Sequence, residues 1–169
     1  EVDLGVGTEL EFMDAEDDIS ADLLYQLPFC VVMPDSHALA RKSEIIWQDL
    51  IDTPLITLQG PFIEQVTAEL DERIANHIQQ ARYKVNFMST ALEMTRQGFG
   101  ITLCLPYMPE VIDWVSANGL QMRPLTQPVK MRRFFIYQRS SRALSPASIA
   151  FKHFLQGYFA THFDDLQNI

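Results

Sequence analysis

Three short segments of the chain could bind a ligand through hydroxyl groups and backbone amides. Each lies at the end of an apolar segment of strand length, at residues 2–6, 55–58 and 83–88. In open α/β sheets, ligands bind beyond the carboxyl ends of strands, opposite the amino ends of helices. The sequence therefore predicts a ligand-binding site made from Gly7, Thr8, Gln59, Gly60, Pro61, Phe62, Phe87, Met88, Ser89 and Thr90.

Several of these residues also have an ordinary structural explanation. The pair Ser89-Thr90 precedes an amphipathic segment, where serine and threonine are good N-cap residues of a helix. The pair Gly60-Pro61 is of the kind found in simple turns, while Phe62 and Met88 are apolar residues that commonly fill cores. For Ser89 the two roles are compatible, because one residue can cap a helix and face a ligand.

The sequence indicates neither an enzyme nor a metal site nor a bound cofactor. Its four histidines stand in no recognisable arrangement with a nucleophile, and it has no Gly-x-Ser-x-Gly, phosphate-loop or His-Glu-x-x-His motif. Six acidic residues lie within residues 9–18, without the alternating ligands and glycine of a calcium loop. A solvated loop is the favoured interpretation, and attraction of a cation is the alternative. We expect no catalytic residue, metal ligand or cofactor.

Cys30 and Cys104 both fall in apolar segments of strand length. Buried cysteines commonly behave as small hydrophobic residues, so we expect two reduced and buried thiols. A disulfide between them is the alternative. A metal site would need the Cys-x-x-Cys or paired histidine spacing that this sequence lacks.

The charge of the chain disfavours nucleic acid as a direct partner. There are 22 acidic and 13 basic residues, giving a formal net charge of −9, and an acidic surface repels phosphate groups. A small basic patch of Lys130, Arg132 and Arg133 is interpreted as protection of a strand edge; contact with a partner subunit or DNA phosphate is the alternative. The sequence has no membrane-spanning run and no signal-peptide pattern, which indicates a cytoplasmic protein without membrane contact.

Strands and helices alternate along the chain, which predicts an α/β fold with a largely parallel sheet. Residues 91–106 read as an amphipathic helix, a glycine turn and a buried strand stopped by a proline. Gly98 and Gly100 are expected to supply positive φ angles in that turn. Apolar residues recurring every four positions predict a long helix over residues 62–78. The pair Ser145-Pro146 is expected to begin the last helix.

Six landmarks follow one another in an order that is more specific than any one of them. They are a strand leading to His37-Ala38-Leu39-Ala40, then Trp47-Gln48-Asp49-Leu50, Thr53-Pro54-Leu55-Ile56, a helix, Gly98-Phe99-Gly100-Ile101 with Leu105-Pro106, and Leu144-Ser145-Pro146-Ala147. In this order they resemble the effector-binding domain of LysR-type bacterial transcription regulators, over about residues 2–158. Ala38 departs from the proline that this family usually has there.

The resemblance implies a two-lobed fold like that of type 2 periplasmic solute-binding proteins, with mixed, largely parallel sheets. Lobe one would comprise residues 1–30 and 138–169, and lobe two residues 31–137. In the family, lobe one begins with two further strand–helix stretches, so lobe one would be incomplete here. The winged helix-turn-helix domain that reads DNA in the family would also be missing, and we expect an N-terminally truncated fragment.

The resemblance also implies ligand sensing. In the family a small metabolite, for example a small carboxylate, binds in the interlobe cleft and changes how the regulator contacts DNA. The implied partners are this effector, further copies of the chain in a homo-oligomer, and DNA through the missing domain only. A solute-binding module for transport is the alternative function; it would carry a signal peptide and two complete lobes.

Overall fold

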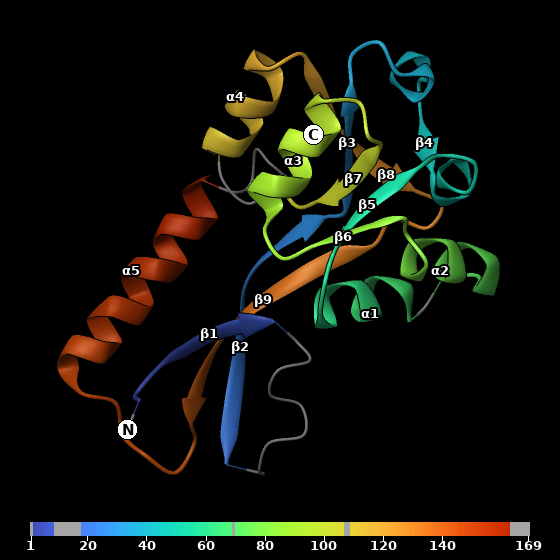
Figure 1. Ribbon diagram of the computed structural model, residues 1–169. Helices are drawn as coiled ribbons and strands as arrows, with labels where there is room; N and C mark the ends of the chain where they lie inside the picture. Colours follow the sequence, from blue (N-terminus) through green and yellow to red (C-terminus); the bar gives the residue numbers. More distant parts are fainter. Residues whose placement is uncertain (1, 9–17, 69, 107–108, 163–169) are drawn as a thin grey trace. The chain divides into compact units, whose positions relative to one another are not determined.

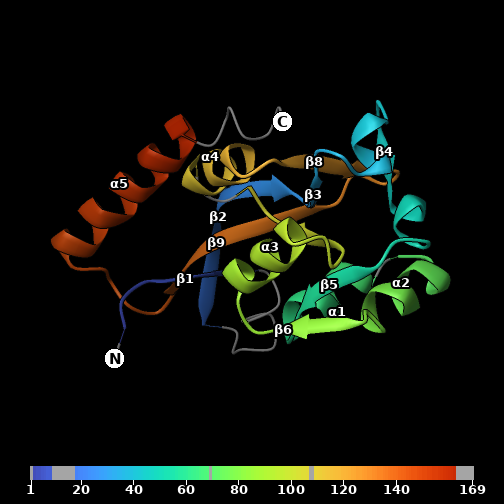
Figure 2. The same ribbon diagram turned by 45° about the horizontal axis from the view of Figure 1, so that its top comes forward.

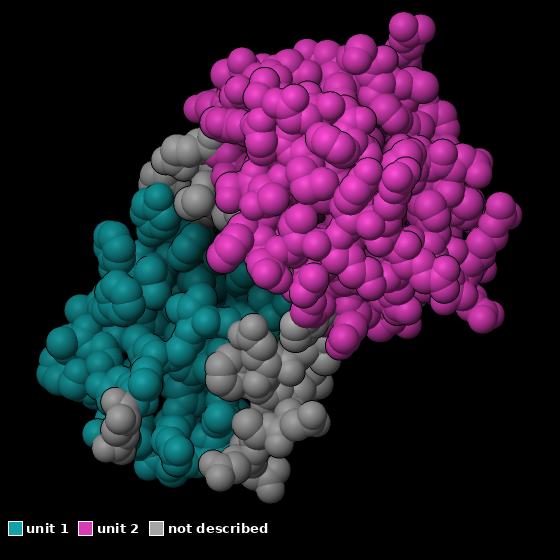
Figure 3. Space-filling model, viewed as in Figure 1, with its two compact units in different colours: residues 1–27, 131–169 teal, residues 28–130 magenta. Residues whose placement is uncertain are grey.

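The computed structural model describes residues 2–8, 18–68, 70–106 and 109–162 (Figure 1). The chain folds into two compact units, which we call unit 1 (residues 1–27 and 131–169) and unit 2 (residues 28–130; Figure 3). It therefore passes from one unit to the other twice, after residue 27 and after residue 130. The crossings expected from the sequence lie near residues 30 and 138.

Unit 1 contains a three-stranded sheet and the last helix. In the sheet, β9 (Met131–Arg139) lies between β1 (Gly5–Thr8) and β2 (Ile19–Pro28). β1 and β9 run antiparallel, from the pair Gly5 and Tyr137 to the pair Thr8 and Phe134. The helix α5 (Pro146–His162) begins as predicted, because the backbone amide of Ser148 donates to the hydroxyl of Ser145 at 3.1 Å.

Two strands of unit 1 differ from the sequence prediction. β1 covers residues 5–8 and not residues 2–6, so Gly7 and Thr8 belong to the strand instead of following it. β2 is not indicated by the sequence, because its residues mix apolar, acidic and polar types without strict alternation. It forms because β9 offers a hydrogen-bonding edge, and that edge is supplied by a segment more than a hundred residues further along the chain.

Unit 2 is built on a six-stranded sheet with the order β4-β8-β3-β7-β5-β6. β5 runs parallel to β6 and β7, and β4 runs parallel to β8, whereas β3 is antiparallel to both neighbours. The predicted α/β class with mixed, largely parallel pairing is thus confirmed. The strands are β3 (Cys30–Pro34), β4 (Ile45–Ile46), β5 (Leu55–Leu58), β6 (Tyr83–Val85), β7 (Ile101–Cys104) and β8 (Leu120–Thr126).

The helices of unit 2 pack on this sheet in two groups. The α3 helix contacts β3, β5 and β7, while α1 and α2 lie beside each other next to β5 (Figures 1 and 2). A core cluster of Val32, Leu92, Cys104, Val115 and Leu120 joins the sheet to α3 and α4. The helical segments are η1 (Ala38–Arg41), η2 (Trp47–Leu50), α1 (Pro61–Thr67), α2 (Glu72–Gln79), α3 (Met88–Arg96) and α4 (Pro109–Ala117). In the described parts of the chain, every helix is too short or too polar to cross a bilayer.

The segment predicted as one long helix forms two. α1 ends at Thr67, and α2 begins after Asp71, whose carboxylate accepts a hydrogen bond from the amide of Arg73 at 3.0 Å. This N-cap satisfies a backbone donor at the start of a new helix. The apolar periodicity persists across the break because Ile74 and Ile78 remain buried, and it therefore gives no sign of the break in the sequence.

The glycine turn after α3 differs from expectation at one position. Gly98 has a φ angle of 81°, as predicted, whereas Gly100 is not in the positive-φ region. Gly100 is needed for close approach instead, because a Cβ atom there would lie 2.3 Å from the carbonyl oxygen of Pro54. The same carbonyl accepts a hydrogen bond from the amide of Ile101 at 2.9 Å, which joins the starts of β5 and β7.

Cys30 and Cys104 are free and buried, as predicted. They lie directly opposite each other on the antiparallel strands β3 and β7, so their side chains share one face of the sheet. Burial raises the pKa of both thiols to about 12, and the nearby Cys104 also contributes to the shift of Cys30. Both groups therefore stay protonated over the physiological pH range.

Candidate functional site

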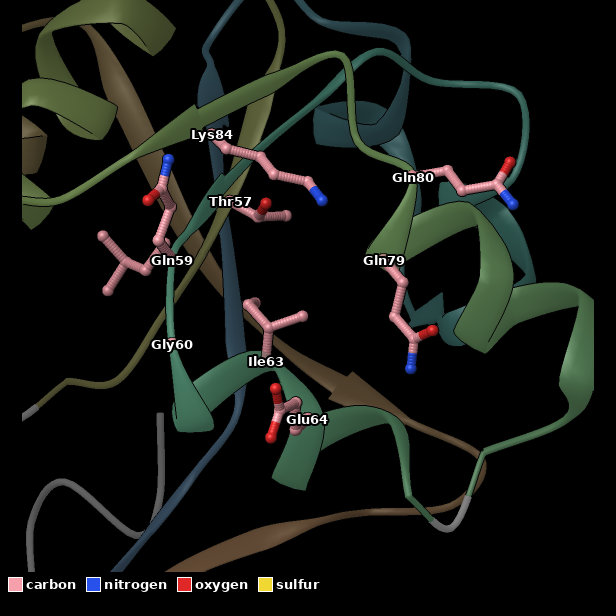
Figure 4. A pocket seen from close by; sticks show the side chains of 9 residues that line it. Thr57, Gln59, Gly60, Ile63, Glu64, Gln79, Gln80 and Lys84 are labelled. Atoms are coloured by element: carbon pink, nitrogen blue, oxygen red, sulfur yellow. The ribbon is translucent and has the colours of Figure 1, made fainter.

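A pocket of about 740 Å³ opens in unit 2 next to β5, β6, α1 and α2 (Figure 4). Gln59 and Gly60, both predicted from the sequence, line it. Pro61 and Phe62 follow them as the first residues of α1, and their side chains lie outside the described residues. The whole lining consists of Thr57, Leu58, Gln59, Gly60, Ile63, Glu64, Gln79, Gln80 and Lys84.

The sheet side of the pocket depends on the pairing of β5 with β6. Thr57 lies opposite Lys84 in this parallel pair, so both side chains are on the same face. The amide of Gln59 donates to the carbonyl of Val85 at 2.9 Å and extends the pairing beyond β5. Gly60 then turns the chain into α1 with a φ angle of 103°, at which a side chain would be strained.

The pocket has one basic and one acidic side chain in its lining. Lys84 comes from β6 and Glu64 from α1, and both are exposed. Figure 4 shows Lys84 reaching from the sheet toward the middle of the pocket and Glu64 on the helix below. Across the described residues, neither side chain has an ion-pair or hydrogen-bond partner. Both charges are thus available to a ligand.

The sheet also contributes a hydroxyl group to the pocket, from Thr57. Thr57 is only 1% exposed, and its hydroxyl has no hydrogen-bond partner in the described part of the chain. On the helix side, the amide of Gln79 donates to the hydroxyl of Thr67 at 3.0 Å, which fixes the Gln79 side chain beside the pocket. The hydroxyl of Thr67 in turn donates to the carbonyl of Ile63 at 2.9 Å. The polar groups of the pocket are therefore held by both strands and helices.

A second hollow, of about 430 Å³, lies between α3 and α4 and is lined by Ser89, Leu92, Glu93, Val111 and Trp114. The carboxylate of Glu93 already accepts hydrogen bonds from Arg96 at 2.6 and 2.8 Å and from Gln97 at 2.9 Å. The bonds from Arg96 are the main reason that the pKa of Glu93 falls to about 2. The one charged side chain of this hollow is thus engaged along its own helix, and the rest of the lining is mostly apolar, with Leu92, Val111 and Trp114.

The predicted residues Gly7 and Thr8 lie in unit 1, within β1. The hydroxyl of Thr8 accepts a hydrogen bond from the guanidinium of Arg132. The carbonyl of Thr8 accepts one from the hydroxyl of Tyr137 at 3.1 Å. The hydroxyl and the carbonyl of Thr8 thus have structural partners in unit 1, and the role of this residue in ligand binding stays a prediction.

The predicted residues at the start of α3 lie inside the helix and not at its N-cap. Phe87 is the N-cap, and Met88, Ser89 and Thr90 already belong to the first turn. Because the cap has an apolar side chain, no side chain accepts from the first backbone amides, and the predicted capping by Ser89 and Thr90 is wrong. Phe87, Ser89 and Thr90 are exposed, whereas Met88 packs against the core cluster.

The sequence did not indicate the other seven lining residues of the larger pocket, which are Thr57, Leu58, Ile63, Glu64, Gln79, Gln80 and Lys84. The register of β5 and β6 and the break between α1 and α2 bring these residues together. One local signal exists, since Thr57 is a polar residue inside an apolar strand. In the described ranges, no group of three or more His, Cys, Asp or Glu side chains could hold a metal ion.

Comparison with known proteins shows one consistent relationship. The family model of the LysR substrate binding domain matches residues 1–160. An uncharacterized HTH-type transcriptional regulator, YbhD of Escherichia coli (strain K12), is 29% identical over 133 residues, which are 73% of this chain and 38% of YbhD. The chain thus spans well under half the length of this curated relative.

Solved regulatory domains have the same fold. The effector binding domain of QuiR in complex with shikimate has a TM-score of 0.69 at 22% identity, covering 95% of this chain and 73% of that one. The CcmR regulatory domain of Synechocystis PCC6803 in complex with 2-PG has a TM-score of 0.72 at 18% identity, covering 94% and 74%. The expected type 2 periplasmic-binding-protein-like α/β fold is therefore confirmed.

Proposed function

Because the chain belongs to the LysR substrate-binding domain family, we propose that it binds a small metabolite and transmits this binding to DNA recognition elsewhere in a longer regulator. The observation that carries the proposal is the pocket of about 740 Å³ in unit 2, which contains Gln59 and Gly60. Concave sites with a few convergent polar groups are the usual form of small-molecule sites. Transport is not favoured, since the matched relative is a transcriptional regulator.

The two crossings of the chain supply a physical basis for transmission. A ligand shifts a conformational equilibrium only by binding one state better than another. If the ligand held by unit 2 also prefers one arrangement of unit 1, binding changes the population of that arrangement. We propose that the effector lies between the units and that Gly7, Thr8 and residues 87–90 contribute to its site.

The proposed partners follow from the same family membership. They are a small-molecule effector, such as a small carboxylate, other copies of the chain in a homo-oligomer, and DNA through a separate helix-turn-helix domain. We propose that the regulator acts in the cytoplasm, where its DNA is, and that the chain has a sensing and not a catalytic role. Figure 4 shows the pocket from which this sensing would start.

The test uses the full-length regulator and its own promoter DNA. DNA binding is measured by fluorescence anisotropy with and without a panel of carboxylates, amino acids and sugar acids. We expect at least one compound to change the apparent dissociation constant for DNA by about fivefold or more, the usual range of allosteric coupling. A regulator whose DNA binding responds to none of the compounds that bind this domain would contradict the proposal.

A further inference from the structure

We propose that the pocket of unit 2 binds a small zwitterion, whose carboxylate pairs with Lys84 and whose ammonium group pairs with Glu64. The inference rests on the proposed function, because it names the chemical class of ligand for the same domain. It is based on the side chains that line the pocket and on the partners they lack.

The two opposite charges that line the pocket have no partner among the described residues. Lys84 on β6 and Glu64 on α1 line one pocket, yet they do not pair with each other or with any other described side chain. A ligand that carries both signs would complete two charge-assisted hydrogen bonds, which are stronger than bonds between neutral groups. Each charge of the ligand would then have an opposite charge in the protein.

The hydroxyl of Thr57 adds a hydrogen-bonding group next to Lys84. This residue lies beside Lys84 on the same face of the sheet, it is 1% exposed, and its hydroxyl has no partner in the described part of the chain. A hydroxyl can donate to a carboxylate that already contacts the ammonium group of the lysine. Thr57 and Lys84 together therefore form the end of the pocket that suits a carboxylate.

The remaining lining excludes other ligand classes. The residues that line the pocket include only one base, Lys84, and the carboxylate of Glu64 would repel a dianion or a phosphate ester. A dication would meet the ammonium group of Lys84 in the same way. A purely apolar ligand would cover both charges without pairing them, which is costly. Ile63 and Leu58 offer apolar contact to the carbon chain of a zwitterion.

The first experiment measures binding to the 169-residue chain by isothermal titration calorimetry. The probes are the twenty standard α-amino acids and 4-aminobutyrate. The best binder is then compared with its carboxylic acid lacking the amino group and its amine lacking the carboxylate. We expect saturable binding of at least one zwitterion. The acid without the amino group and the amine without the carboxylate should each bind roughly tenfold more weakly or worse. Binding of either single-charge compound within threefold of the zwitterion, or no zwitterion binding, would overturn the inference.

The second experiment places the ligand in this pocket. Lys84→Met and Glu64→Gln should each weaken binding of the best zwitterion by roughly tenfold. Arg73→Met and Glu72→Gln are matched controls, because both residues are exposed on α2 and neither lines the pocket. Circular dichroism and melting curves confirm folding of all four variants. Equal affinity of the pocket variants and the controls would refute the assignment.

The inference and the proposed function fail in different ways. If a ligand with a single charge binds and changes DNA recognition, the inference falls and the proposed function stands. If a zwitterion binds through Lys84 and Glu64 without any effect on DNA recognition, the ligand class stands and the regulatory role falls.

Discussion

Ser89 lines the hollow between α3 and α4 from the first turn of a helix whose N-cap, Phe87, makes no side-chain hydrogen bond. A side-chain cap contributes about 1 kcal/mol to stability only where its hydrogen bond exists. Ser89 makes no such bond, so its hydroxyl is not needed for the helix. A substitution of Ser89 can therefore affect ligand binding without affecting the stability of the helix.

We predict that Ser89→Ala changes the free energy of unfolding by less than about 0.5 kcal/mol, the usual range for surface substitutions. Ser145→Ala is the matched control, since the hydroxyl of Ser145 does accept from the amide of Ser148. That variant should lose about 1 kcal/mol. Urea denaturation of both variants measures the difference, and equal losses would show that Ser89 acts as a cap after all.

The thiols of Cys30 and Cys104 make stability depend on alkaline pH. In the folded chain the pKa of each thiol is about 12, whereas the ordinary value is 9.0. The folded state thus binds more protons between these values, and stability falls as the pH rises in this window. The stabilisation that these protonated thiols provide is fully present below about pH 9.

We expect the free energy of unfolding of the wild-type chain to fall more steeply between pH 8 and pH 11 than that of the double variant Cys30→Ala, Cys104→Ala. The slope is compared, so any constant loss from the smaller side chains cancels. Tyr25, whose pKa burial raises to about 12, contributes equally to both proteins. Guanidinium unfolding at several pH values measures the slopes; parallel curves would contradict the prediction.

At the scale of elements, the approach of β7 to the residue before β5 constrains the turn at Gly100. The carbonyl oxygen of Pro54 would lie 2.3 Å from a Cβ atom at this position, and it also accepts from the amide of Ile101. Backbone atoms cannot rotate away as a side chain can. Any side chain at position 100 must therefore push two neighbouring strands apart.

Gly100→Ala should destabilise unit 2 by about 1–3 kcal/mol, the usual cost of overpacking. Gly157→Ala is the control, because Gly157 lies in α5 with open space around its Cα and alanine is the better helix former. That variant should gain up to about 1 kcal/mol. Thermal unfolding of both variants measures the effects, and an unaffected Gly100→Ala protein would disprove the close approach.

At the scale of the whole molecule, the excess of acidic residues disfavours binding of the chain to DNA. A formal net charge of −9 opposes the approach of a phosphate backbone, and no counterion release drives association. The basic residues before and within β9 do not change this balance, since Arg132 is engaged with Thr8 in unit 1. We therefore expect this chain alone to bind DNA weakly, which agrees with the proposed sensing role.

We predict that the dissociation constant of the chain alone for promoter DNA is above about 10⁻⁶ M at physiological salt. Its affinity would then be no higher than that of non-specific binding. A gel-shift titration measures this, with the full-length regulator as the positive control. Tight retention of promoter DNA over a scrambled duplex would contradict both the charge argument and the proposed division of labour.

Local patterns were sufficient for much of the fold. The apolar residues of β5 and β7, the start of α5 at Ser145-Pro146 and the burial of both cysteines were all predictable, because each depends on residues close together in the sequence. The order of the landmarks also indicated the LysR family, which the family model confirms over residues 1–160. Two of the lining residues of the pocket, Gln59 and Gly60, followed from their position at the end of a strand.

The sequence by itself thus determined the α/β class, the family and one edge of the pocket, since these are written in local composition and in the order of motifs. Only the tertiary structure decided that β2 pairs with β9, that residues 62–78 form two helices, and that Lys84 comes to lie beside Thr57. The physical reason is the same in each case. Strand register and helix packing are chosen by partners far away in the chain, and no local pattern contains the free energy of those contacts.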